Sequence, residues 1–190
     1  MQQPFGTLIA TLWIVWLAYW VVSAAAVKPT ARSESVQSRL LYSVPLWIGA
    51  WLLFGGADMP EVLRTRFLPD TAAIAILGTA MTAAGLVFAV WARVILGSNW
   101  SGMVTVKEGH ELVERGPYTL VRHPIYTGLI FGLLGTAIAT GEWRGIVAIV
   151  LVIGSCWYKL RTEERMMRET FGAAYDDYAR RVRALVPFLI

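Results

Sequence analysis

Long apolar stretches dominate this sequence and restrict it to folds that a lipid bilayer can hold. A helix that crosses the hydrocarbon layer needs about 20 apolar residues, because each unpaired backbone group in lipid costs several kcal/mol. Five stretches reach or approach that length, and they run from Phe5 to Val27, Leu40 to Ala57, Thr71 to Leu96, Ile125 to Thr140 and Trp143 to Trp157. The sequence therefore predicts an all-α, polytopic integral membrane protein with about five transmembrane helices.

Composition and charge argue against a soluble domain, a nucleic-acid-binding protein and a metal site. Hydrophobic residues make up 56% and charged residues 16% of the 190 residues, well outside the range of soluble domains. A net charge of +4 could suggest a nucleic-acid partner, but the basic residues are interleaved with apolar runs, so none is expected. Cys156 has no second cysteine, and His110 and His123 lack a metal-ligand spacing, so no metal site is predicted. Because no repeat or linker divides the chain, residues 1–190 are expected to form a single membrane domain.

The basic residues are distributed unequally between the connections and so predict an orientation. If the five stretches alternate across the membrane, 14 Lys and Arg side chains fall on one side and 3 on the other. Positively charged connections stay in the cytoplasm, which places the N-terminus outside and the C-terminal region in the cytoplasm. The polar segments 97–124 and 159–186 then share the cytoplasmic face. We expect a multi-pass membrane protein whose active site faces the cytoplasm.

The first polar segment ends where the fourth apolar stretch begins. Gly116 and Pro117 are a turn signal, and Pro124 suits the first turn of a helix, where a missing N–H group costs nothing. His123 and Tyr126 are then neighbours at the positive end of the helix dipole. Aromatic and basic residues also gather at this depth as simple membrane anchors, and the position by itself leaves both interpretations open.

The second polar segment, Lys159 to Val182, has the spacing of an amphipathic helical region that Gly172 weakens or breaks. Its unusual feature is a pair of adjacent carboxylates, Glu163 and Glu164, beside the membrane boundary. Such a pair is costly unless cationic groups meet it. Arg168 lies four residues after Glu164 and can pair with it, which leaves Glu163 available to the ammonium group of a ligand.

Small residues recur along the fourth apolar stretch. Gly128, Gly132 and Gly135 follow one another at spacings of four and three, which places them on one face of a helix. Glycines at such spacings let membrane helices approach closely. We interpret them as a packing surface rather than as direct ligand contacts.

Motifs from both polar segments follow one another in a fixed order. The series is Gly116-Pro117-Tyr118, Val121-Arg122-His123-Pro124, Tyr126 and Gly128, then Glu163-Glu164, then Phe171-Gly172, Tyr175 and Tyr178. In this series the chain resembles the isoprenylcysteine carboxyl methyltransferase family, which belongs with the phospholipid N-methyltransferases to a wider set of integral-membrane methyltransferases. The resemblance covers approximately residues 87 to 189. It implies a catalytic region over residues 87–190, with residues 1–86 as N-terminal helices of unassigned role.

The resemblance implies a pocket for S-adenosylmethionine at the cytoplasmic ends of the last helices. Carried over by position, the residues expected to bind this cofactor are His110, Glu111, Leu112, Val113, Tyr118, His123, Pro124, Tyr126, Glu163 and Glu164. The first four look like the segment that lines the adenosine, and Glu163 looks like the partner of the methionine ammonium group. The family also holds its acceptor with a basic side chain on the last membrane helix.

Which basic side chain holds the acceptor is left open by the sequence. Alignment through Phe171-Gly172 favours Lys159, and matching the Arg-Thr-Glu-Glu string favours Arg161. Arg122 is a third cation that could position an anionic acceptor.

Methyl transfer from cytosolic S-adenosylmethionine to the carboxylate of an isoprenylcysteine-type lipophilic acceptor in the bilayer is therefore the expected activity. Three other functions stay open. The same fold could methylate nitrogen or sulfur in a phospholipid or small molecule. A sterol-type membrane reductase would use NADPH instead, and a membrane scaffold would have no activity. The sequence does not indicate an oligomeric state.

Overall fold

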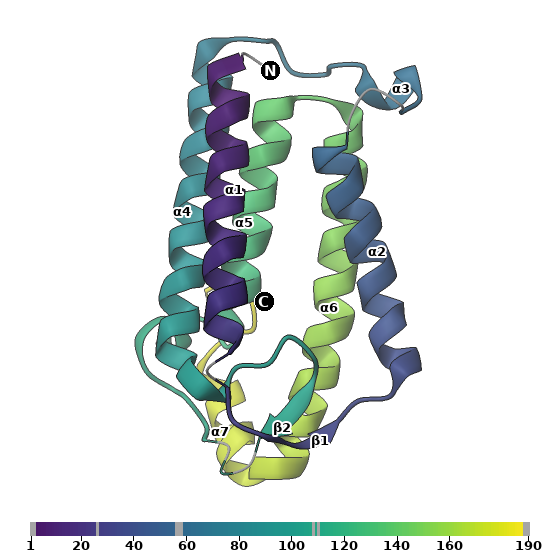
Figure 1. Cartoon of the computed structure of the whole chain (residues 1–190). Coiled ribbons are helices and arrows are strands. Elements are labelled where there is room, and N and C mark those ends of the chain that lie inside the picture. The colour runs from purple at the N-terminus through teal and green to yellow at the C-terminus, as the bar shows by residue number, and fades with distance from the viewer. Residues whose placement is uncertain (1–2, 26, 56–58, 108, 110, 188–190) are drawn as a thin grey trace.

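Long helices form the body of the protein, and the computed structural model describes residues 3–25, 27–55, 59–107, 109 and 111–187. The long helices run side by side (Figure 1) and are α1 (Gln3–Ala24), α2 (Val36–Phe54), α4 (Ala72–Leu96), α5 (Pro124–Thr140) and α6 (Trp143–Phe171). The shorter ones are α3 (Glu61–Arg64), α7 (Ala173–Arg181) and the 3-10 helices η1 (Gly97–Asn99) and η2 (Gly116–Thr119). Helix α4 packs against both α5 and α1, while α6 packs against α2 and α5.

The surface of these helices is suited to lipid. Helices α1, α4 and α6 are long and apolar enough to cross a membrane, and α5 is a shorter apolar helix. Large apolar side chains such as Ile14, Val87 and Val150 are exposed on their outer faces. In water such faces would be unfavourable, whereas hydrocarbon accommodates them. The chain is a multi-pass membrane protein.

Local signals in the sequence predicted most helix ends. Thr71 caps α4 by accepting a hydrogen bond from the backbone N–H of Ile74 at 3.4 Å. Pro124 is the first residue of α5, as predicted. Gly141, with φ of 67°, ends α5 in the left-handed conformation, so only Gly141 and Glu142 separate α5 from α6. The tight hairpin expected here is confirmed.

The last long helix is the main correction to the predicted elements. Helix α6 does not end at Trp157 but continues without a break to Phe171. The segment from Lys159, which was predicted to be an amphipathic helical region, is therefore as far as Phe171 the polar end of the same helix. Nothing between Trp157 and Phe171 disfavours the helical backbone, and Gly172, with φ of 53°, ends it where a break was expected. The two carboxylates, Glu163 and Glu164, thus lie on one uninterrupted helix.

A two-stranded sheet departs from the all-α prediction. Strands β1 (Thr30–Ser33) and β2 (Thr105–Lys107) pair antiparallel at the end of the bundle where α6 becomes polar (Figure 1). Each strand is too short to show a two-residue periodicity, and their pairing joins segments about 70 residues apart. The sheet ties the connection between α1 and α2 to the segment that follows α4.

The predicted glycine surface lies where α4 and α5 meet. A Cβ atom added at Gly128 would lie 2.6 Å from the carbonyl oxygen of Gly85, and one added at Gly135 would lie 2.5 Å from the backbone nitrogen of Thr82. Both contacts are closer than real Cβ atoms come, so these two positions require glycine. Gly132 differs, since a Cβ atom there would make an ordinary contact of 3.5 Å with Leu86. The interpretation of the glycines as a packing surface is confirmed.

Two neighbouring glycines give a matched test of this packing. Gly135→Ala is expected to lower the thermal unfolding temperature by several degrees, because overpacking costs roughly 1–3 kcal/mol. Gly132→Ala, on the same helix, is expected to change it by no more than about one degree, since the space there is sufficient. Thermal unfolding of both variants in detergent measures the difference. Equal effects would contradict the close approach of α4 and α5.

Candidate functional site

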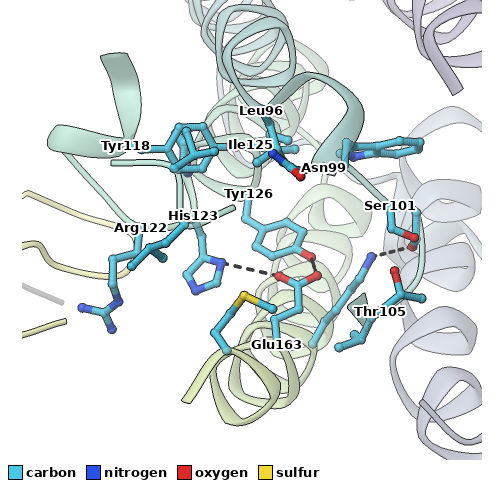
Figure 2. Close-up of a pocket in the computed structure, with 18 of the residues that line it drawn as sticks. Leu96, Asn99, Ser101, Thr105, Tyr118, Arg122, His123, Ile125, Tyr126 and Glu163 are labelled. Atoms are coloured by element: carbon cyan, nitrogen blue, oxygen red, sulfur yellow. Dashed lines mark hydrogen bonds and ion pairs between the residues drawn. The ribbon is translucent and has the colours of Figure 1, made fainter. Parts of the chain in front are cut away.

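A pocket lies at the polar end of the bundle, between the segment after α4, the start of α5 and the polar part of α6 (Figure 2). It encloses about 250 Å³. The two polar segments of the sequence were predicted to share one site, and both contribute to its walls. The predicted site residues that line it are Glu111, Leu112, Val113, Tyr118, Arg122, His123, Pro124, Tyr126, Lys159 and Glu163. His110 lies outside the described residues.

Glu163 is the central anion of this pocket. The Tyr126 hydroxyl donates a hydrogen bond to its Oε1 at 2.5 Å, and His123 Nδ1 lies 3.5 Å from its Oε2 (Figure 2). The rings of His123 and Tyr126 stack with centroids 5.6 Å apart. This arrangement follows from Pro124, because starting α5 there puts His123 at the helix cap and Tyr126 in the first turn. The carboxylate is therefore held in one orientation.

Glu164 is adjacent in sequence but has a different environment. Adjacent residues on a helix point about 100° apart, so only one of two neighbouring carboxylates can face a given side. Glu164 is 3% exposed and lies outside the residues that line the pocket. Its predicted pair with Arg168 is present at 3.4 Å, but Arg122, whose Nε lies 3.0 Å from Oε1, is the nearer partner. Glu164 therefore pairs with two arginines outside the pocket lining, and its predicted contact with a cofactor stays a prediction.

Arg122 uses its charge to hold the C-terminal segment in place. Besides Glu164, its guanidinium donates hydrogen bonds to the carbonyl oxygens of Ala179 and Val182. Its backbone N–H donates to the carbonyl oxygen of Arg183 at 2.7 Å. In Figure 2 the side chain points away from Tyr126 and Glu163. Of the three cations considered for an acceptor, Arg122 is thus already engaged elsewhere.

Lys159 and Arg161 lie on different sides of α6. Lys159 lines the pocket, where its Nζ donates a hydrogen bond to the carbonyl oxygen of Gly102 at 2.8 Å and lies 5.1 Å from the ring centre of Tyr42 and 5.6 Å from that of Tyr126. Arg161 stacks on Trp157 at 4.5 Å and borders a separate groove. Residues two apart on a helix point in nearly opposite directions, which explains the separation. Of these two residues, Lys159 lines the pocket and Arg161 does not.

His123 connects the two carboxylates. Besides its contact with Glu163, its Nε2 lies 3.4 Å from Oε1 of Glu164. Burial of the imidazole lowers its pKa, but hydrogen bonds and negative charge from Glu163 and Glu164 raise it more, so the pKa of His123 lies above its ordinary value. The protonated ring is therefore favoured and helps to neutralise the carboxylate pair.

This raised pKa predicts a pH dependence of stability. The protonated ring contributes fully below the ordinary histidine pKa of about 6.5, and the contribution is lost as the pH rises through the higher pKa of the folded protein. From pH 6 to 9 the unfolding temperature is expected to fall roughly 2–4 °C further than that of a His123→Gln variant, the change that about 1 kcal/mol produces in a chain of this length. Parallel curves for the two proteins would contradict the coupling. Thermal unfolding in detergent at each pH provides the data.

Part of the pocket comes from residues that were not among the predicted site residues. These lining residues are Trp20, Leu96, Asn99, Trp100, Ser101, Gly102, Met103, Val104, Thr105, Ile125, Leu129, Met167, Tyr175 and Tyr178. Tyr175 and Tyr178 belong to the motif series, and Met167 lies in the segment predicted to be an amphipathic helical region, so these three had a signal. Trp20 had none, because it lies about 80 residues from the segment it meets, with its ring 5.6 Å from that of Trp100.

The N-terminal half, to which the sequence assigned no role, also fixes the pocket wall. Lys28 Nζ donates hydrogen bonds to Asn99 Oδ1 at 3.0 Å and to the carbonyl oxygen of Gly109 at 2.8 Å, and lies 3.6 Å from Oε1 of Glu111. Glu34 is buried, accepts a hydrogen bond from the Tyr42 hydroxyl, and accepts another from the backbone N–H of Val104 at 3.2 Å. The segment between α1 and α2 therefore holds the residues that follow α4.

A sequence model described as phospholipid methyltransferase matches residues 73–174, which is more than half of the chain and contains most of the pocket. The chain belongs to this family. Among relatives in this methyltransferase family, a probable protein-S-isoprenylcysteine O-methyltransferase from Oryza sativa subsp. indica is 29% identical over 134 residues, which cover 69% of this chain and 70% of the relative. The expected membership of the membrane methyltransferases is confirmed.

Two further relatives differ in how much of this chain they cover. A protein-S-isoprenylcysteine O-methyltransferase from Xenopus laevis is 26% identical over 197 residues, covering 98% of this chain and 65% of the relative. A cobalt-zinc-cadmium resistance protein from Cupriavidus metallidurans is 32% identical over 97 residues, covering 50% of this chain and 44% of the relative. The first alignment includes the N-terminal helices, for which the sequence had shown no resemblance.

Proposed function

We propose that this chain transfers a methyl group from S-adenosylmethionine to the carboxylate of an isoprenylcysteine-type lipophilic acceptor. The observation that carries the proposal is a pocket with one anion and one cation on the same helix. Glu163 and Lys159 both line it, one turn of α6 apart. Such a pocket suits a pair of ligands of which one presents an ammonium group and the other a carboxylate.

The residues present fit S-adenosylmethionine. When bound, this cofactor supplies a methyl group already activated by a positively charged sulfur. Glu163, held by Tyr126 and His123, can accept hydrogen bonds from the methionine ammonium group. The aromatic rings in the pocket wall offer their electron-rich faces to a cation. Leu112 and Val113 provide an apolar surface for the adenosine.

Lys159 is suited to position the acceptor. Its ammonium group has three N–H donors, of which one is directed to the Gly102 carbonyl oxygen. The remaining donors can bind a carboxylate, which is ionised at neutral pH and is a nucleophile without any base. The protein then needs only to align this oxygen with the methyl group and to exclude water. Little acid–base machinery is required.

The proposed membrane arrangement brings both ligands to the pocket. All five long helices cross the bilayer, with the N-terminus outside and the pocket at the cytoplasmic face. Helices α2 and α5, of 19 and 17 residues, are about 29 and 26 Å long and so approach the hydrocarbon thickness of about 30 Å. S-adenosylmethionine then arrives from the cytosol. The acceptor, with its lipid chain, arrives from the bilayer between helices.

Methylation of a phospholipid amine is the second candidate, because the matching family is described as phospholipid methyltransferase. An amine must lose a proton before it can attack. His123 lines the pocket, but its raised pKa favours the protonated ring, which cannot accept that proton. The charge of Lys159 disfavours a cationic amine in the same pocket, so we place the carboxylate first. Family membership argues against the reductase and scaffold interpretations.

An acceptor panel tests the proposal. Purified protein is incubated with radiolabelled S-adenosylmethionine and a prenylcysteine, phosphatidylethanolamine or a thiol. The expected product is a base-labile methyl ester of the prenylcysteine alone. Labelling of the amine alone would overturn the choice of acceptor. Calorimetry that detects binding of NADPH but none of S-adenosylmethionine would overturn the methyltransferase proposal itself.

A further inference from the structure

A second groove is lined by residues at the start of α2 and in the middle part of α6, and it shares no lining residue with the first pocket. The two helices touch where a Cβ atom added at Gly49 would lie 3.0 Å from Val152. From there they spread apart toward the end that carries β1 (Figure 1). The residues that line the groove here include Leu41 of α2 and Gly154, Trp157, Arg161 and Arg165 of α6.

Two arginines give this groove its charge. Arg161 and Arg165 are exposed, lie one helical turn apart on α6, and both line the groove. Among the described residues neither has a carboxylate partner, whereas Arg122, Arg168 and Arg181 each pair with one. Like charges at this spacing repel, and an anion placed between them would remove the repulsion.

The other end of the groove is apolar. Leu41 is exposed, and a Cβ atom added at Gly154 would meet no atom within 4 Å, so there is free space beside this part of α6. Trp157 lies between the apolar and basic ends and stacks with Arg161. Tryptophan with a basic neighbour is typical of the boundary between hydrocarbon and headgroups. The groove therefore changes from basic to apolar along the direction from the headgroups into the bilayer.

We propose that this groove binds an anionic glycerophospholipid, with its phosphate between Arg161 and Arg165 and an acyl chain beside Leu41 and Gly154. Guanidinium groups match phosphate oxygens in geometry as well as in charge. The apolar end selects a lipid over a free phosphate ester, because only the lipid has a chain to fill it. This assignment gives Arg161 a function outside the catalytic pocket and does not depend on methyl transfer.

Native mass spectrometry of the full chain in detergent tests the assignment. The protein is expected to retain phosphatidylglycerol about fivefold or more over phosphatidylcholine, and Arg161→Gln/Arg165→Gln to lose that preference. Arg180→Gln/Arg181→Gln is the matched control, because it removes the same charge from α7, outside the groove. This control is expected to keep the preference. Equal retention of the two lipids by the parent, or a preference that survives in the Arg161→Gln/Arg165→Gln variant, would overturn the proposal.

A second variant tests the apolar end without touching the arginines. Gly154→Leu fills free space rather than displacing an atom, and it is expected to lower phosphatidylglycerol retention about threefold or more. Unchanged retention would overturn the placement of the acyl chain. Excess glycerol 3-phosphate is expected to leave the lipid bound, and its complete displacement would overturn the choice of a lipid. Elution of each variant at the parent's position in size-exclusion chromatography shows that its folding is intact.

Discussion

Glu163→Gln is expected to weaken the binding of S-adenosylmethionine by about 100-fold or more. The substitution keeps the shape of the side chain but removes the negative charge that is proposed to meet the ammonium group. Breaking one side of a buried ion pair costs roughly 3–5 kcal/mol, and each 1.4 kcal/mol is a factor of ten in affinity. Isothermal titration calorimetry on the purified protein measures the change.

The same substitution elsewhere provides the control for this result. Glu61 lies in α3, at the opposite end of the molecule (Figure 1), and Glu61→Gln is expected to leave the affinity unchanged. Tyr126→Phe removes the hydroxyl that orients Glu163 but keeps its charge, so a smaller loss, about tenfold, is expected. Parent-like binding by Glu163→Gln would show that the ammonium group is held by another residue.

Lys159→Gln is expected to raise the KM for a prenylcysteine acceptor about tenfold or more while leaving the Kd for S-adenosylmethionine within about threefold of the parent. Loss of the ammonium group removes the cation that would position the acceptor carboxylate. A hydrogen bond between two charged groups is strong, so losing one of the two charges is expected to raise the KM by this factor. Initial rates at varied acceptor concentration give the KM. Calorimetry gives the Kd independently.

Arg161→Gln is the matched control for Lys159→Gln, because it removes the same charge two residues along the same helix. It lies on the other side of α6, stacked on Trp157, and is expected to change the KM by less than about threefold. The reverse result, with a large effect of Arg161→Gln and a small effect of Lys159→Gln, would reassign the acceptor site. Since the sequence left these two residues as alternatives, this pair of variants decides between them.

Local patterns were sufficient for much of the fold. The apolar stretches predicted helices at the right places, because a helix in lipid must satisfy its own backbone and so needs a long continuous run. Pro124 and Gly172 marked one helix start and one helix end, because each residue changes the allowed backbone by itself. The fifth apolar stretch ends at Trp157 while α6 runs on to Phe171, because a helix that leaves the bilayer changes its composition without changing its backbone.

The motif series also indicated where the candidate site would form. His123, Tyr126 and Glu163 were named from the sequence, and the fold brings them together around one carboxylate. Their roles toward a cofactor remain a proposal that the variants above address. Trp20, which lines the pocket, and Glu34, which binds the lining residue Val104, could not have been named, since their roles depend on contacts with segments about 70 to 80 residues away.

The sequence by itself determined that long helices bury this chain in a membrane and that its chemical groups gather in two polar segments. Only the tertiary structure decided which of two nearby residues on α6 faces the pocket. Glu163 faces the pocket while Glu164 binds Arg122, and Lys159 faces it while Arg161 does not. The physical reason is rotation along a helix: each residue turns by about 100°, so residues one or two apart point in different directions, and only the packed neighbours show which direction is the pocket.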